Sequence, residues 1–190
     1  MNILVDRLPI SIEIGGKEYE INSDFRYCLS TILAFEDEEL ADIEKYQIML
    51  LNLYKEIPED LNEALQKAIW FLNCGNEKLD EEFSGMRLYS FQKDANYIFA
   101  AFKQTHNIDL QTIEYLHWWE FMALFMDLGQ DTTFCQLISL RKRVKTGKAT
   151  KEEREIAREM GDVFDIPDYD ERTLEEKEAE RLFLEAMEVH

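Results

Sequence analysis

One stretch of this sequence combines residue types that could bind a metal ion. Glu114 and His117 are three residues apart, and Glu120 follows after three more. On a helix this spacing places the side chains on one face, as in helical bundles that bind metals through Glu-x-x-His motifs. A carboxylate-bridged metal pair needs two such motifs, but neither His106 nor His190 has a carboxylate three residues earlier. We therefore expect a polar edge on an apolar helix, and a metal-dependent enzyme remains only an alternative.

Other catalytic motifs give no support for an enzyme. Cys28, Cys74 and Cys135 are far apart and odd in number, which argues against a zinc site or a disulfide framework and fits a reducing cytoplasm. The sequence has no Gly-x-Ser-x-Gly, and Thr146-Gly147-Lys148 lacks the upstream glycine and strand of a phosphate-binding loop. We expect no enzymatic activity, no cofactor and no bound metal.

The adjacent pair Trp118 and Trp119 could stack on a ligand. Neighbouring positions on a helix point in directions about a third of a turn apart, so the two rings cannot form one platform. Aromatic side chains serve more often as large apolar groups in a core. Core packing is therefore the preferred interpretation of this pair.

The charge of the chain limits its partners. It has 40 Asp and Glu against 21 Lys and Arg, a formal net charge of -19, which disfavours nucleic acids and anionic lipids. No stretch approaches the roughly 18 apolar residues of a membrane span, and the first residues do not resemble a secretion signal. The basic patch from Arg141 to Lys148 has no interleaved aromatics, so we expect a helix end or a contact for an acidic neighbour. These features favour a cytoplasmic protein that binds other proteins.

The elements that would position these residues are mostly helices. Alternation around Gly15-Gly16 predicts a β-hairpin at about 10–21. Apolar spacing then predicts helices from Phe25 to the acidic run 36–39, over 40–54, and from Pro58 to Gly75. A polar loop is expected at 76–87. Together with the helices below, this predicts a mainly α fold: a compact domain of about six to eight helices with a small N-terminal hairpin.

The second half of the chain continues the helical pattern. We expect helices from near Ser90, over the very apolar stretch 113–128, and from Thr132 or Thr133 into the basic patch. Thr150 and Glu153 have the spacing of a capping box, which is repeated by Thr173 and Glu176. The expected division is a helical domain at 1–148 and an acidic helical extension at 149–190.

The predicted final helix has an apolar side that includes Leu182, Phe183 and Met187. That side either packs on the core or forms an arm that binds another protein. We therefore expect partner binding through Leu182, Phe183 and Met187, and through Arg141 and Arg143 of the basic patch.

Several stretches resemble the bacteriophage gene-product-fifteen family of tailed phages and prophages. They cover roughly the first 145 residues in the expected order, and the strongest combines Ile108-Asp109-Leu110 with Leu116-His117-Trp118-Trp119-Glu120-Phe121. The others are 12–19 with Asn22-Ser23-Asp24-Phe25-Arg26, Glu63-Ala64 through Ile69-Trp70-Phe71 to Cys74-Gly75, and 89–95 with 97–102. The chain departs from the family pattern at 104–107, where an aromatic-glycine turn is usual, and in its acidic end after Asp165.

The resemblance implies a role in phage tail assembly. Members are commonly taken to be tail assembly chaperones encoded near the tape-measure protein, and no catalytic residues come with the family. A chaperone for a long helical rod would need exposed apolar faces and a large net charge. We therefore expect an oligomeric protein of the host cytoplasm that binds the tape-measure protein. The alternative is a structural tail or connector subunit that is retained in the virion.

Overall fold

The computed structural model describes residues 2–76 and 86–166. This part of the chain contains a two-stranded sheet, seven α-helices and one short 3-10 helix, which confirms the predicted mainly α fold with an N-terminal hairpin. The chain forms two compact units. The described part of unit 1 comprises 2–76 and 115–122, and that of unit 2 comprises 86–114 and 123–166.

The N-terminal hairpin of unit 1 forms where the alternation predicts it. β1 (Ser11–Ile14) pairs with β2 (Lys17–Glu20), and Ile12 lies opposite Tyr19. Gly15 and Gly16 have φ angles of 57° and 78°, which is the left-handed backbone of a tight two-residue hairpin turn. The Gly15 N–H donates to Glu63 Oε2 at 2.9 Å, so the turn is held by a carboxylate of α3.

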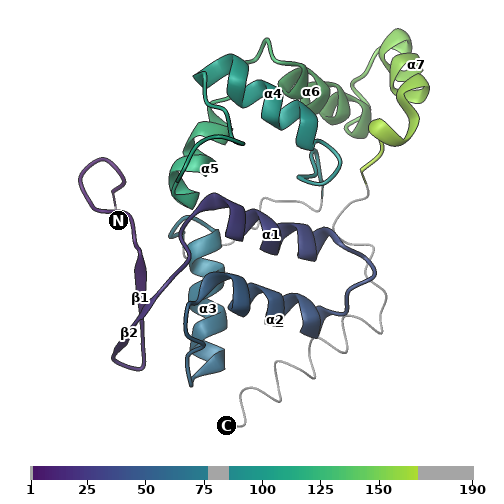
Figure 1. Cartoon of the computed structure of the whole chain (residues 1–190). Helices are drawn as coiled ribbons and strands as arrows, with labels where there is room; N and C mark the ends of the chain where they lie inside the picture. The colour runs from purple at the N-terminus through teal and green to yellow at the C-terminus, as the bar shows by residue number, and fades with distance from the viewer. Residues whose placement is uncertain (1, 77–85, 167–190) are drawn as a thin grey trace. The chain divides into compact units, whose positions relative to one another are not determined.

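Three helices complete most of unit 1. α1 (Phe25–Glu36), α2 (Asp42–Leu53) and α3 (Leu61–Leu72) form a layer in which α1 packs on α2 and α2 on α3 (Figure 1). Capping fixes two of the starts, because the carboxylates of Asp24 and Asp60 accept from backbone N–H groups of the first turns of α1 and α3. Pro58 was predicted at the start of the third helix. It is a buried residue of the preceding segment instead, because Asp60 provides the cap.

The apolar helix predicted over 113–128 is shorter than expected. α5 runs only from Trp118 to Met126, and its residues up to Met122 belong to unit 1 while the rest belong to unit 2. The backbone just before α5 is hydrogen-bonded to the start of α1, another part of unit 1. The Leu116 carbonyl accepts from Phe25 N, and the Leu116 N–H donates to Asp24 Oδ2. Periodicity within 113–128 carries no information about these distant partners.

Unit 2 contains α4 (Ala95–His106), α6 (Thr133–Lys145) and α7 (Lys151–Met160), followed by η1 (Gly161–Val163). α4 begins five residues later than the predicted start at Ser90, because residues 91–94 form turns instead. The caps of α6 and α7 are confirmed: Thr132 accepts from Cys135 N, and Thr150 and Glu153 form a capping box. The unit has a small core of apolar side chains, formed by Leu137, Ala157 and Phe164 with Tyr97, Leu140, Val144 and Met160 packed against it.

Two predictions fall wholly or largely outside the described residues. The loop expected at 76–87 overlaps the range 77–85, and the final helix after Thr173 lies within 167–190. The expected domain boundary at residue 148 falls between α6 and α7, two helices that pack against each other in unit 2.

Candidate functional site

His117, the centre of the possible metal motif, is a buried helix cap. Its side chain is 3% exposed, its Nδ1 accepts from the Trp119 N–H at 3.0 Å, and its Nε2 lies 3.0 Å from the Pro9 carbonyl. A carbonyl oxygen can only accept, so Nε2 carries the proton and the ring is neutral. Burial lowers the pKa of His117 and favours the same state. Both ring nitrogens are therefore used by the backbone of unit 1, and neither is left for a metal ion.

Trp118 and Trp119 are core residues, as their apolar character suggests. Their side chains are 1% and 4% exposed, and their indole N–H groups donate to the carbonyls of Leu72 and Phe71 at 2.9 and 2.8 Å. These acceptors lie in the last turn of α3, where helical carbonyls lack partners within the helix. The pair thus joins α5 to the C-terminal end of α3 and offers no platform for a ligand.

The close approach of Trp119 explains the glycine that follows α3. Gly75 has a φ of 79°, and a Cβ atom added there would lie 2.8 Å from Trp119 Cη2. The segments that carry the family resemblance in unit 1 therefore meet around the start of α5, although they lie up to about a hundred residues apart in the sequence. These contacts join the N-terminal end of α5 to α1 and α3 within unit 1.

Of the two cysteines of unit 1, Cys28 is buried in the core and Cys74 is half-buried. Burial raises the pKa of the Cys28 thiol well above its usual range and that of Cys74 to about 11. Because the thiolate is the reactive form, neither side chain is prepared to act as a nucleophile at neutral pH. Among the described residues, no group of three or more His, Cys, Asp or Glu side chains could hold a metal ion.

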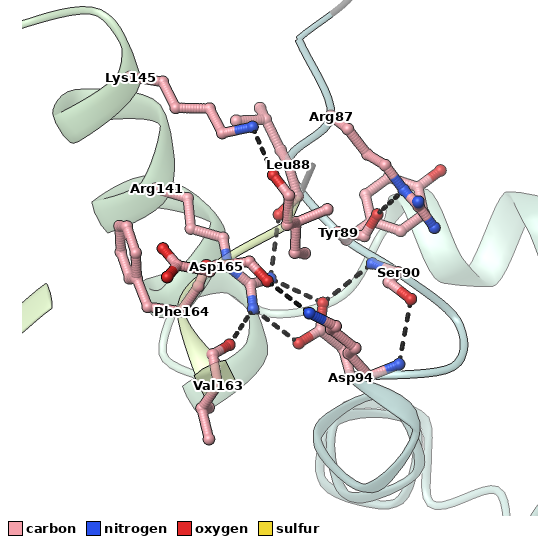
Figure 2. A network of polar contacts seen from close by, with 12 residues as sticks. Arg87, Leu88, Tyr89, Ser90, Asp94, Arg141, Lys145, Val163, Phe164 and Asp165 are labelled. Carbon is pink, nitrogen blue, oxygen red and sulfur yellow. Dashed lines mark hydrogen bonds and ion pairs between the residues drawn. The ribbon is translucent and has the colours of Figure 1, made fainter. Parts of the chain in front are cut away.

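Arg141, predicted to bind a partner, is fully buried in unit 2 (Figure 2). Its guanidinium meets Asp94 in a two-pronged ion pair, with Nη1 2.6 Å from Oδ2 and Nη2 2.9 Å from Oδ1. The remaining donors reach the carbonyls of Leu88, Val163 and Phe164. All five N–H groups of the arginine are thus used inside the unit. Arg141 has no surface through which it could contact a partner.

Two lysines extend this network to the end of the described chain. Lys93 Nζ donates to the Asp165 carbonyl at 2.8 Å, and Lys145 Nζ donates to the Ile166 carbonyl at 2.9 Å. Together with Arg141, these cations hold the backbone of 163–166 against α6 and the start of α4. Two residues of the basic patch, Arg141 and Lys145, therefore bind the backbone of 163–166 inside the unit, just before the acidic C-terminal residues.

Arg143, the other predicted contact in the patch, remains accessible. Its side chain is 43% exposed and pairs with Glu153 at 2.8 Å, which links α6 to α7. Leu182, Phe183 and Met187 lie outside the described residues. No local pattern identifies Asp94 as the partner of Arg141, because its neighbours in the sequence do not distinguish it from the many other acids of the chain.

Exposed apolar side chains gather on unit 1. Of the fifteen large apolar residues that are exposed in the described chain, twelve belong to this unit. They include Tyr27 and Phe35 on α1, Ile43 and Leu51 on α2, and the N-terminal turn Ile3-Leu4-Val5. Side chains of this kind are what a protein-binding surface requires, so unit 1 carries the candidate interaction surface. None of the described helices is long and apolar enough to cross a membrane.

Comparison with known proteins identifies a family but no individual relative. The family described as "Bacteriophage Gp15 protein" matches residues 4–166, which include nearly all of the described chain. No curated protein and no solved structure matches the chain. The match covers far more than half of the sequence and agrees with the motifs that meet in unit 1. The chain belongs to the bacteriophage Gp15 protein family.

Proposed function

We propose that this phage protein is a non-enzymatic tail assembly chaperone that binds helical segments of the tape-measure protein. The observation that carries the proposal is the concentration of exposed apolar side chains on unit 1 of a chain with a net charge of -19. Apolar faces can cover the helical rod, and the charge keeps the complex in solution. Membership of a phage family supplies the context. The protein acts in the host cytoplasm and as an oligomer.

The way the polar groups are used supports the proposal of a non-enzymatic role. His117 caps a helix, Arg141 and Asp94 pair with each other, and Cys28 is buried. A binding role needs none of these groups to be free. A structural tail or connector subunit would share the same exposed faces, and it differs in remaining part of the virion.

Co-expression with the tape-measure protein of the same phage tests the proposal. We expect the tape-measure protein to become soluble and to co-purify with this chain. A full-length variant with Leu182→Ser, Phe183→Ser and Met187→Ser serves to test the predicted C-terminal arm. Loss of the complex in this variant supports the arm, and retention assigns binding to unit 1 alone. If the wild-type chain forms no complex, the chaperone proposal is wrong and the structural subunit replaces it.

A further inference from the structure

The end of the α1–α2 pair combines exposed apolar groups with an acidic turn. Phe35, in the last turn of α1, is 41% exposed, and its ring meets that of Tyr46 on α2 at 5.7 Å. Ile43 lies one turn before Tyr46 and is 46% exposed, and Leu51, two turns farther along α2, is 65% exposed. Because Ile43, Gln47 and Leu51 follow at intervals of four, they lie along one side of the helix. We call Phe35, Ile43 and Leu51 the α1–α2 face.

The charge beside this face is mainly negative, and Lys45 is the first cation after the acidic run. Residues 36–44 contain six acids and no Lys or Arg. The last turn of α1 has no basic residue, so these acids follow the negative end of the helix dipole without a cation from that turn. By contrast, α4, α6 and α7 each have basic residues in their last turn. The α1–α2 face is thus an exposed apolar surface beside a local excess of negative charge.

We propose that the α1–α2 face docks a cationic amphipathic helix, with its apolar side on Ile43 and Leu51 and its Lys or Arg side chains toward residues 36–44. The inference rests on the partner-binding role proposed above and names the chemistry of the bound segment. Helix-in-groove and helix-on-face recognition uses apolar anchors at helical spacing, and complementary charge fixes orientation and speeds association.

Charge also argues against the chain's own C-terminal segment as the occupant. Residues 167–190 contain nine acids and three Lys or Arg, a net of -6 before the histidine is counted. Placing this segment beside the acidic turn would bring like charges together. A partner that carries positive charge gains from the same turn. The face therefore fits a separate basic helix better than it fits the chain's own end.

Peptide binding by the full-length protein tests this inference. The probe is a synthetic amphipathic helix of about 18 residues, long enough to fold on docking, built from leucine and lysine. A matched peptide carries glutamate in place of lysine. We expect the lysine peptide to bind, and to bind at least about tenfold more weakly at 0.5 M than at 0.05 M salt, because added ions screen exposed charges. The glutamate peptide is expected not to bind.

Variants locate the binding surface. Ile43→Ser with Leu51→Ser, and separately Glu38→Gln with Glu39→Gln, should each weaken binding of the lysine peptide by about tenfold. Met126→Ser is the matched control, because Met126 is an apolar residue of unit 2 that is 78% exposed. It should bind like the wild type. Thermal unfolding of each variant verifies that these exposed substitutions leave the fold intact.

Four outcomes would overturn the proposal. The lysine peptide could fail to bind, or the glutamate peptide could bind equally well. The Ile43/Leu51 variant could keep full peptide affinity yet dissociate an oligomer, which would assign the face to a second copy of the chain. The Leu182/Phe183/Met187 variant could lose peptide binding, which would assign the peptide to the C-terminal segment and not to the face. Peptide binding without tape-measure co-purification would contradict only the proposed partner. Co-purification of the tape-measure protein without peptide binding would contradict only the role of this surface.

Discussion

The polar residues that could have bound a metal ion or a partner, His117 and Arg141, stabilise the fold instead. His117 has the spacing of a metal ligand, yet both of its ring nitrogens bind backbone groups. Arg141 belongs to a basic patch, yet it is fully buried. Sequence reasoning placed both on helices or at their ends, but it could not place their partners. Pro9 and Asp94 lie 108 and 47 residues away, and no local pattern indicates such pairings.

Replacement of His117 tests its role as a neutral cap. His117→Ala should lower the free energy of unfolding by about 1–2 kcal/mol at pH 7.5, because it removes the acceptor for Trp119 N–H. His117→Asn, which retains a side-chain acceptor, should lose less. Urea unfolding followed by circular dichroism measures both variants. Equal stability of the alanine variant and the wild type would show that the cap contributes nothing.

The pH dependence of unfolding tests the neutral state of the same residue. The pKa of His117 is lower in the folded protein, so below about pH 6.5 the unfolded chain binds more protons and stability falls as pH falls. The stability advantage of the wild type over His117→Asn should therefore shrink between pH 7.5 and 5.5, by at most about 1.4 kcal/mol per pH unit. An advantage that grows on acidification would mean that the folded protein prefers the charged ring.

The buried ion pair of unit 2 should be costly to break. Asp94→Asn leaves the Arg141 charge without its counter-ion at a site where both side chains are fully buried. Loss of one partner of such a pair typically costs about 3–5 kcal/mol. Guanidinium unfolding should show a loss in this range for Asp94→Asn, whereas the exposed pair of Lys55 and Glu20 should tolerate Glu20→Gln with little change. A loss below about 1 kcal/mol at Asp94 would exclude this role.

Helices and strands whose ends depend on neighbouring residues were predicted correctly, whereas ends that depend on distant contacts were not. The hairpin, the start of α6 and the capping box of α7 follow from residues within a few positions of one another. The starts of α4 and α5 were placed too early. α5 begins late because Leu116 pairs with Asp24 and Phe25, a contact between segments about ninety residues apart. The prediction from apolar composition alone therefore included residues before Trp118 whose backbone is hydrogen-bonded to the start of α1.

The junction of α3 and α5 can be tested with a pair of glycine substitutions. Gly75 and Gly16 have nearly equal φ angles of 79° and 78°, but only Gly75 lies against Trp119. Gly16→Ala should therefore lower the free energy of unfolding by only about 1 kcal/mol, the cost of a left-handed backbone at alanine. Gly75→Ala should cost clearly more and should change the tryptophan fluorescence, because its Cβ would displace the Trp119 ring. Equal losses at the two positions would mean that the close approach is absent.

For the whole molecule, the sequence was sufficient to identify the fold class and the family. The resemblance rests on motifs in both units, several of which the structure brings together in unit 1, and the family match covers residues 4–166. Neither the motifs nor the family match could show which apolar residues stay exposed, because exposure depends on how α1, α2 and α3 pack. That distribution is what supports a binding protein, and it gives the proposed role a defined surface.

The proposed chaperone role requires that this protein assists tail assembly and is not part of the finished tail. Quantitative mass spectrometry of purified virions, beside the lysate of the same infected cells, tests this requirement. We predict abundant protein in the lysate and none in virions beyond trace carry-over, while the tape-measure protein is present in both. Stoichiometric amounts of this chain in purified virions would contradict the chaperone role and identify a structural subunit.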